Sequence, residues 1–504
     1  MSVITMVYKK YEVDVLVVGG GMAGVAAAIT AARNRANTLL IESQTSLGGI
    51  ATNGLVNGIA GTIEGLCQEF VDRMKIEDAF SPPNIFDPEK AKYVLEQWLL
   101  ETGAAVLYGT CAIDVSVENR SVKEVVVYNK SGKAAIEAKV IVDATGDADV
   151  AAMAGVPYEV GGKEFGGLNQ STTLVFKLSN VNLRKYEDAR NEWRAKEKIP
   201  SKISLITEFM EKAVQGGDLP YFIFPTALIY PASSASKENC EVTVNAAHSF
   251  YCRCTDAADL TRQLIEQRQQ IMLLEKFFKK YVPGFENCRL SQIGSLLGVR
   301  DSRRIIGEYI LTAEDVVCAR KFEDGIARFP EFLDTHHPTS PKIGFKRHIH
   351  LREPKEPAVC RPAQCSAEMH PLCRLGGYEA RVRPGEYCEI PYRCLVPLKI
   401  DNLLVAGRCV SADFDALAAI RVIGTCMSMG QAAGTAAALC IKNGIMPRRL
   451  DGKILREKLI EQGVPLDKEP ASRWANIVKD LKSRGEIDYV VTAGDFVTPL
   501  QRLK

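Results

Sequence analysis

The sequence lacks several features that would place it in other classes of protein. Its net charge is only +2 over 504 residues, so no charge excess favours binding to nucleic acid or to an anionic membrane. No apolar run reaches the length of a membrane span, and the N-terminal stretch 1–12 contains no apolar signal core. We therefore expect a cytoplasmic protein that binds neither nucleic acid nor membrane.

Cysteine is abundant, at 15 residues, but no C-x2-C pair is present. That pair is typical of zinc and iron–sulfur sites, so its absence argues against a metal centre. The closest groupings are the cluster Cys360, Cys365, Cys373, Cys388 and Cys394 and the pair Cys252 and Cys254. We interpret them as reduced, buried thiols in a reducing compartment, and we expect no metal.

The stretch 13–42 predicts a dinucleotide-binding site. Val13–Val18 is a short, β-branched apolar run, which predicts a buried strand. It leads into Gly19-x-Gly21-x-x-Gly24 and a helix rich in alanine that begins at Met22 and Ala23. The three glycines suit a tight turn, a close approach of pyrophosphate and close packing of helix on strand, with the phosphates at the helix N-terminus.

A second predicted strand, Thr38–Ile41, ends at Glu42 and Ser43. The carboxylate of Glu42 stands at the right distance to bind ribose hydroxyls. No Lys or Arg follows until Arg73, so a 2′-phosphate has no counter-charge and the cofactor is predicted to be FAD or NAD, not NADP. Gly48 and Gly49 then suit a loop that wraps an extended cofactor.

Short alternating segments follow a predicted helix at Asp87–Glu101, and they distinguish FAD from NAD. The segments 105–108, 112–117, 122–128 and 134–138 predict an antiparallel meander, and Val140–Val142 predicts a further buried strand that leads to Thr145 and Gly146. A meander at this point is typical of the glutathione-reductase-like FAD fold. No second G-x-G-x-x-G follows a strand, so we predict no NAD(P)H-binding domain.

The order of these motifs, with a change of composition after about residue 161, predicts an α/β chain: a glutathione-reductase-like FAD-binding Rossmann domain with an inserted α+β substrate domain. We expect the first part of the FAD-binding domain at 1–160, the substrate domain at 161–394, the second part of the FAD-binding domain at 395–446 and a C-terminal appendage at 447–504. The second part contains a strand at 401–406, a loop at 409–420 and a helix at 424–438. Gly430, Gly434 and Ala438 recur every four residues and would form a smooth helix face, while free N–H groups near Gly424 and Thr425 would face the flavin.

Two groups of residues are candidates for substrate chemistry. Arg300, Arg303 and Arg304 lie within five residues, and as a helix they would share a face that either binds an anion or forms structural ion pairs. Only six histidines are present, and four of them fall within 336–350. His336 lies between acidic and proline residues and is a candidate general base.

These motifs together resemble the FAD-dependent oxidoreductase family, which is broadly related to the fumarate reductase flavoproteins. The resemblance covers 13–463 and rests on VVGGGMAGVAAA, the Leu47-Gly48-Gly49 loop, VDATGDADVAAMAG, GVRDSRRIIGEY, DTHHP, IPYRCLVPLKIDNLLVAGRCVSAD and RVIGTCMSMGQAAGTAAA. It implies bound FAD, with substrate between the flavin and the inserted domain. Family members commonly carry a histidine where Phe414 stands, and no histidine precedes His248, so an N-terminal histidyl–flavin bond is absent.

The residues and the resemblance together predict a set of sites. The predicted cofactor-binding residues are Gly19, Gly21, Met22, Ala23, Gly24, Glu42, Ser43, Gly48, Gly49, Ala112, Thr145, Gly146, Asp147, Gly407, Arg408, Asp413, Gly424 and Thr425. The predicted catalytic residues are His336, as proton acceptor or donor, and Arg303 and Arg421, as cations that orient the substrate.

The function expected from these sites is hydride transfer between flavin and a small organic substrate, as in a dehydrogenase or reductase. A flavin monooxygenase and an electron-transfer flavoprotein subunit that acts with a partner remain alternatives. The sequence names neither the substrate nor the electron acceptor or donor, and it is compatible with a homo-oligomer.

Overall fold

A computed structural model gives the structure of the chain. It describes residues 9–81, 84–196, 205–224, 227–231, 238–330, 333–340, 349–353, 356–359, 387–468, 489–491 and 497–499. The predicted cysteine cluster lies partly outside these residues, since Cys360, Cys365 and Cys373 are not among them.

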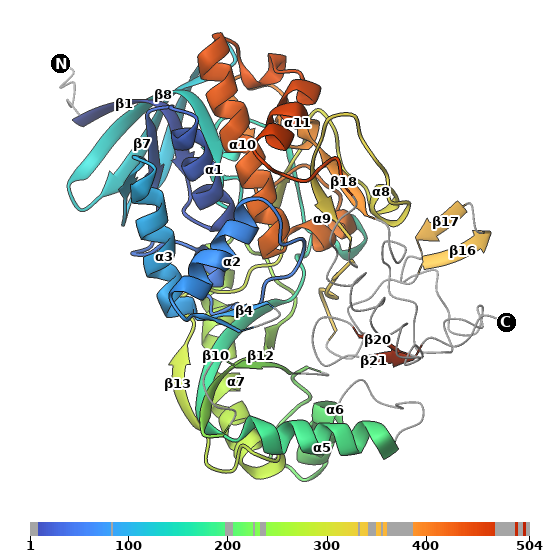
Figure 1. The fold of residues 1–504 in the computed structure, drawn as a ribbon. Helices are drawn as coiled ribbons and strands as arrows, with labels where there is room; N and C mark the ends of the chain where they lie inside the picture. The colour runs from blue at the N-terminus through green and yellow to red at the C-terminus, as the bar shows by residue number, and fades with distance from the viewer. Residues whose placement is uncertain are drawn as a thin grey trace.

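Helices and strands alternate in the first part of the described chain and again near its end (Figure 1). The helices are α1 (Met22–Arg33), α2 (Leu66–Ile76), α3 (Pro88–Glu101), α4 (Asp149–Met153), α5 (Leu183–Lys196), α6 (Leu205–Gln215), α7 (Ala257–Tyr281), α8 (Ala313–Val317), α9 (Phe414–Ile420), α10 (Ile423–Asn443) and α11 (Gly452–Glu461). The strands are β1 (Lys9–Val18), β2 (Thr38–Ile41), β3 (Phe80–Ser81), β4 (Ile85–Phe86), β5 (Ala105–Leu107), β6 (Cys111–Glu118), β7 (Ser121–Asn129), β8 (Gly132–Asp143), β9 (Tyr158–Val160), β10 (Thr172–Val181), β11 (Leu228–Pro231), β12 (Cys240–Ser249), β13 (Arg289–Ile293), β14 (Arg303–Ile305), β15 (Gly325–Phe329), β16 (Ile349–Glu353), β17 (Glu356–Val359), β18 (Cys388–Pro391), β19 (Leu403–Val405), β20 (Tyr489–Val491) and β21 (Val497–Pro499).

The largest sheet confirms the predicted Rossmann core. Its strand order is β5-β2-β1-β8-β7-β6, and β19 pairs with β8 as a seventh strand. The strands β5, β2, β1, β8 and β19 run parallel to one another, whereas β6, β7 and the first half of β8 form an antiparallel meander. Parallel strands bring their carboxyl ends to one edge of a sheet, so the turns after β1, β2, β8 and β19 meet there.

Two details of the predicted meander are wrong. The segment at Ala105 does not belong to it, because β5 pairs in parallel with β2 at the opposite edge of the sheet. The segments 134–138 and 140–142 are one continuous strand, β8, whose first half pairs with β7 and whose second half pairs with β19. Lys139 lies between the two apolar segments and interrupts the apolar pattern without ending the strand.

Helix α10 returns from the far end of the chain and packs along α1, as Figure 1 shows (orange against blue). The contact is close because glycines line it. A Cβ at Gly430 would lie 2.0 Å from the carbonyl oxygen of Ala23, and a Cβ at Gly434 would lie 2.1 Å from that of Ala27. The smooth helix face predicted from the repeat of small residues is therefore present.

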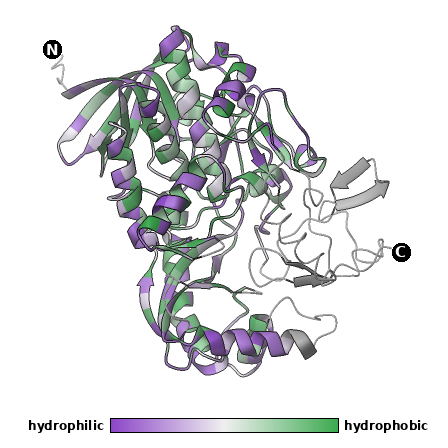
Figure 2. Cartoon of the chain, viewed as in Figure 1, coloured by the Kyte–Doolittle hydropathy of each residue, from purple (hydrophilic) through white to green (hydrophobic). Residues whose placement is uncertain are grey.

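A second sheet, of order β11-β12-β10-β13, forms an α+β unit inserted between β8 and β19 in the chain. All of its neighbouring strands are antiparallel, and α7 packs against β10 and β12. Its buried residues form a core of their own, which includes Phe176, Phe278 and Phe285. The coloured part of α5 in Figure 2 is mostly hydrophilic, as expected for a helix on the outer side of this unit.

Three further segments differ from the predictions. The arginine-rich segment is not helical, because Arg303–Ile305 forms β14 and pairs with β9. The predicted loop 409–420 contains α9, which Asp413 caps by accepting from the amides of Asp415 and Ala416. The segment 447–468 is not a surface appendage, since its leucines at 455 and 459 are buried in the main core.

Among the described residues, no single helix is long and apolar enough to cross a membrane. Helices α9 and α10 reach that length and composition only when taken together, and they are bent by 93° at their junction.

Candidate functional site

The loop after β1 has the geometry of a dinucleotide-binding turn. Gly19 has a φ of 101°, a conformation that favours glycine, and a Cβ at Gly24 would lie 1.8 Å from the Gly19 carbonyl oxygen. At Gly21, by contrast, a Cβ would meet no protein atom within 4 Å. The loop therefore leaves open space at the one glycine where a phosphate would approach the backbone.

Glu42 lies at the end of β2 and binds this loop directly. One carboxylate oxygen accepts from the amide of Gly20 at 2.5 Å, and the other accepts from the amide of Gln44 at 2.7 Å and from the hydroxyl of Ser43 at 3.1 Å. Each carboxylate oxygen has two lone pairs, so acceptor capacity remains for a ribose hydroxyl. The side chain is 7% exposed.

The other predicted residues around this loop also lie close to it. Gly48 donates its amide to the carbonyl of Gly20 at 2.8 Å, and a Cβ at Gly49 would lie 3.1 Å from the Cα of Gly21. Met22 and Ala23 form the buried first turn of α1. Ala112 lies two residues after Thr110, whose amide donates to the carbonyl of Glu42 at 2.9 Å.

The turn after β8 is held by the buried carboxylate of Asp143. It accepts from the amide and hydroxyl of Thr145 at 3.1 and 2.7 Å and from the amide of Ala151 at 2.9 Å. Burial raises the pKa of Asp143 to about 6, against the effect of these hydrogen bonds. Gly146 has a φ of 79°, which turns the chain away from the strand.

Asp147 and Arg408 join this turn to the one after β19. Their ion pair has an N–O distance of 2.9 Å, and Ser302 donates to Asp147 at 2.5 Å and accepts from Arg408 at 2.8 Å. Gly407 precedes Arg408 with a φ of 91°, and a Cβ there would lie 3.1 Å from the Cβ of Ala23. Arg408 therefore lies where the two turns meet, and it is already paired by protein groups.

The remaining predicted cofactor residues lie at the starts of α9 and α10. The carboxylate of Asp413 is occupied by backbone amides: one oxygen caps α9, and the other accepts from Ala313 at 2.9 Å. The Gly424 amide donates to the carbonyl of Ala60 at 2.9 Å, so it is not the free N–H group that was predicted. The hydroxyl of Thr425 is buried and has no hydrogen-bond partner in the described part of the chain.

A second cluster, the His336 cluster (Gln170, Asp334, His336 and Arg421), brings together two of the three predicted catalytic residues. The Nε2 atom of His336 lies 3.3 Å from the carboxylate of Asp334, and the His336 amide donates to the Gln170 side chain at 3.0 Å. Arg421 donates to the Asp334 carbonyl at 2.7 Å and lies 3.4 Å from its carboxylate. Arg421 also lies 3.3 Å from the Gln170 side-chain oxygen.

Burial and charge set the protonation of this cluster. Burial and the nearby charge of Arg300 lower the pKa of His336 to about 4, although Asp334 acts in the opposite direction. Burial alone would raise the pKa of Asp334, but His336, Arg421 and Arg300 hold it well below its usual value. At neutral pH the cluster therefore has a neutral imidazole, an ionised carboxylate and a guanidinium.

Arg303, the third predicted catalytic residue, has different partners. Its guanidinium donates to the carbonyl of Asp147 at 3.0 Å and to the carboxylate of Asp149 at 2.8 Å, and it stacks over Tyr158. Arg300 is the arginine of this segment whose charge acts on His336 and Asp334. Arg303 is the first residue of β14, which pairs with β9, whereas Arg300 lies three residues before this strand.

Three residues of this region escaped the sequence prediction. Nothing local marks Gln170, whereas Asp334 begins the DTHHP motif but was assigned no role of its own. His248 stands alone in a strand, yet its ring stacks on Phe224 at a centroid distance of 3.6 Å and lies 6.1 Å from the ring of His336.

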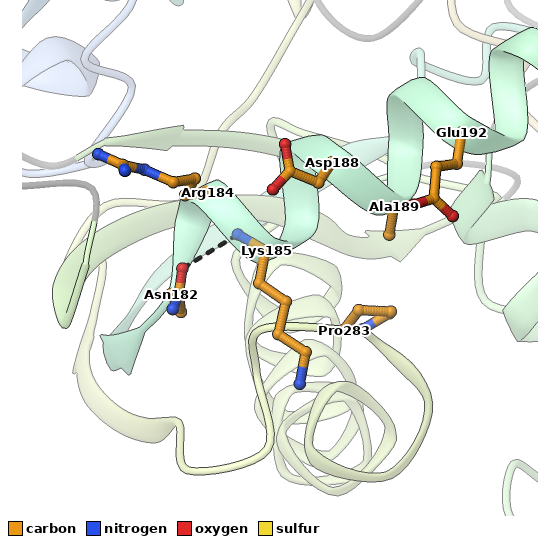
Figure 3. Close-up of a pocket in the computed structure, with 7 residues that line it drawn as sticks. All are labelled: Asn182, Arg184, Lys185, Asp188, Ala189, Glu192 and Pro283. Carbon is orange, nitrogen blue, oxygen red and sulfur yellow. Dashed lines mark hydrogen bonds between the residues drawn. The ribbon is translucent and has the colours of Figure 1, made fainter.

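Other candidate features have no link to these clusters. Within the part of the chain that the structure describes, no group of three or more His, Cys, Asp or Glu could hold a metal ion. A surface pocket of about 460 Å³ lies at the start of α5 and is lined by Asn182, Arg184, Lys185, Asp188, Ala189, Glu192 and Pro283 (Figure 3). It contains none of the predicted site residues.

The fold and the first cluster define a dinucleotide-binding protein, and comparison with known proteins identifies its family. A model of the FAD dependent oxidoreductase family matches residues 14–459. The chain belongs to this family, and it is an FAD-dependent oxidoreductase.

One curated relative and two solved structures illustrate the range of similar proteins. A thiamine thiazole synthase from Methanococcus aeolicus is 31% identical over 151 residues, which are 28% of this chain and 57% of that protein. A geranylgeranyl bacteriochlorophyll reductase-like protein from Thermoplasma acidophilum is 14% identical, with a TM-score of 0.43 and coverage of 90% of this chain and 84% of that one. A p-nitrophenol 4-monooxygenase from Pseudomonas putida is 12% identical, with a TM-score of 0.44 and coverage of 94% and 93%. Likenesses at this level say nothing about the reaction.

The residues present fit FAD. The open space at Gly21 and the remaining acceptor capacity of Glu42 suit the adenosine diphosphate end. The buried hydroxyl of Thr425, which has no protein partner among the described residues, suits a hydrogen bond to the cofactor from the first turn of α10.

Proposed function

We propose that this protein is a dehydrogenase or reductase that transfers a hydride between its flavin and a small organic substrate, with His336 exchanging the proton. The observation that carries the proposal is the buried contact of His336 with Asp334, at 3.3 Å, beside the guanidinium of Arg421. Bound flavin supplies the hydride chemistry, and the protein must then orient the substrate and move a proton.

The contact with Asp334 sets which nitrogen of His336 can act as a base. An ionised carboxylate can only accept, so Nε2 of the imidazole carries the hydrogen and Nδ1 is the basic nitrogen. The depressed pKa of about 4 keeps the imidazole neutral at neutral pH, as a proton acceptor must be. Asp334 thus orients the ring and stabilises the imidazolium formed after proton transfer.

Two guanidinium groups are available to orient the substrate. Arg421 keeps the role predicted from the sequence, since its Nε is buried without a hydrogen-bond partner in the described part of the chain. For the second cation we propose Arg300 in place of Arg303, because the guanidinium of Arg303 is paired with Asp149.

Anaerobic reduction of the holoenzyme by candidate substrates tests this proposal. Alcohols, amines, hydroxy acids and saturated acids are added without oxygen, and enoates are added to the chemically reduced protein. We expect loss of the oxidised-flavin absorbance with one class of donor, or its return with an enoate. If no organic compound changes the spectrum, and oxygen from O2 is instead inserted into a product, the protein is a monooxygenase and the proposal fails.

A further inference from the structure

Arg300 is a buried cation without a carboxylate partner among the described residues. It is 9% exposed, and its Nη1 donates only to neutral acceptors, the Ser171 carbonyl and the Thr173 hydroxyl, both at 2.6 Å. Burial and the charge of Arg421 lower its pKa to about 9, so it is still charged at neutral pH. The charge of Asp334 partly offsets these effects, but the guanidinium forms no direct ion pair among the described residues, which favours an anion as the ligand.

His248 lies on the same face of the second sheet as this contact. In the pairing of β10 with β12, Thr173 stands directly opposite His248, and residues that stand opposite one another share a face. Because the guanidinium of Arg300 donates to the hydroxyl of Thr173, it lies on the face of the sheet that carries the His248 side chain. The near-parallel ring of His336, at 6.1 Å from that of His248, joins this arrangement to the His336 cluster.

The tautomer of His248 follows from its hydrogen bond to the backbone. Nδ1 lies 3.2 Å from the carbonyl oxygen of Ala246, and a carbonyl can only accept, so Nδ1 carries the hydrogen. Burial and the charge of Arg300 hold the pKa of His248 well below its usual value, which keeps the ring neutral. Nε2 is therefore a bare acceptor, and it is buried without a hydrogen-bond partner in the described residues.

We propose that the substrate is a hydroxycarboxylate, whose carboxylate binds Arg300 and Arg421 and whose hydroxyl group donates to Nε2 of His248. This inference rests on the proposed function, since it concerns the same site. It describes how the substrate is recognised and not which of its bonds reacts. A hydroxyl group suits the acceptor better than an amino group. An amine is protonated at neutral pH and would place another positive charge beside Arg300.

Binding to the oxidised holoenzyme tests the inference without turnover. Isothermal titration calorimetry compares matched acids that differ only in the hydroxyl group: glycolate and acetate, lactate and propionate, malate and succinate, mandelate and phenylacetate. Lactamide serves as a neutral counterpart, and alanine as an amino counterpart. We expect the hydroxy acid of at least one pair to bind about tenfold or more tightly than its partner, because the site's acceptor is otherwise left unpaired.

Two variants separate the roles of the two residues. Arg300→Met should weaken both acids of the preferred pair by a similar factor of about tenfold or more, since it removes the charge that both acids use. His248→Phe keeps a ring against Phe224 but removes the acceptor, so it should weaken only the hydroxy acid. His248→Gln supplies a side-chain oxygen and should restore part of the preference. Arg120→Met, at an exposed arginine paired with Asp401, is the matched control and should change neither acid.

The inference is overturned if no pair shows a preference for the hydroxy acid, if none of the acids binds, if alanine or lactamide binds as well as lactate, or if His248→Phe weakens both acids equally. Flavin content and melting temperature, measured for every variant, show whether the fold is intact, and His248→Gln takes over the test if His248→Phe does not fold. The proposed function stands or fails separately, because reduction of the flavin by any organic donor supports it.

Discussion

Gly430 of α10 lies directly against Ala23 of α1, so closely that a Cβ on Gly430 would stand 2.0 Å from the carbonyl oxygen of Ala23. This contact joins the C-terminal third of the chain to the helix whose first turn is predicted to bind the cofactor phosphates. The two halves of the FAD site are therefore held in register by backbone packing that only glycine allows.

Gly430→Ala should force α10 away from α1. Overpacking of this kind costs about 1–3 kcal/mol, and here it also displaces the cofactor helix, so the variant should lose both thermal stability and bound FAD. Ser428→Thr adds one methyl group on a half-buried position of the same helix and should change the two quantities much less. Equal melting temperatures and flavin content for Gly430→Ala and the unmodified protein would contradict the packing argument.

Two glycines of the first turn should respond differently to alanine. Gly21→Ala meets no protein atom within 4 Å, so the apoprotein should keep its melting temperature while the affinity for FAD falls by about tenfold or more. Gly24→Ala would place its Cβ 1.8 Å from the Gly19 carbonyl oxygen and should destabilise the apoprotein itself. Apoprotein melting and FAD titration measure the two effects. Unchanged FAD affinity in Gly21→Ala would show that the cofactor phosphates do not bind at this loop.

His336 should make folding stability depend on pH. Its pKa of about 4 in the folded protein lies below the ordinary value of 6.5, so the unfolded chain binds more protons between these values. The contribution of His336 to the free energy of unfolding is therefore constant above about pH 6.5. As the pH falls towards 4, this contribution decreases by on the order of 3 kcal/mol in total.

The difference between the unmodified protein and His336→Phe isolates this effect. Asp143 acts in the opposite direction, because its raised pKa of about 6 favours the folded state at lower pH, but it is present in both proteins and cancels. Denaturant unfolding at pH 7 and pH 5 should show a larger loss of stability in the unmodified protein. An identical loss in both proteins would mean that His336 is not buried in its neutral form.

Asp147 and Arg408 should show strong energetic coupling. Replacing one member of a half-buried ion pair leaves the other without its partner, which costs about 1–3 kcal/mol. Asp147→Asn and Arg408→Met should each destabilise the protein, and the double variant should lose clearly less than the sum of the two. Additive losses in a double-mutant cycle would show that the pair contributes little.

Much of the first cluster could be predicted from the sequence because its signals are local. The apolar run of β1, the glycines after it and the acid that ends β2 lie within about 30 residues of one another, and each has a direct physical meaning. Asp413 also carried a local signal, because an aspartate followed by FDALAAI is typical of a short capped helix. The prediction of a loop at 409–420 missed this signal.

The His336 cluster could not be predicted in the same way. Gln170 stands 166 residues from His336 and 251 from Arg421, so their contacts depend on how the inserted unit packs on the core. The arginine-rich segment was predicted to be helical for a related reason. The spacing of Arg300 and Arg304 suits a helix, but Arg303–Ile305 forms β14 and pairs with β9, more than 140 residues earlier in the chain. Non-local pairing overrides local periodicity at such positions.

The most direct test of the account is the rate at which substrate reduces the flavin of His336→Phe in a single anaerobic turnover. We predict that this variant retains FAD and substrate binding, while the rate falls by about 100-fold to 10,000-fold because the proton acceptor is missing. An unchanged rate with full flavin content would contradict it.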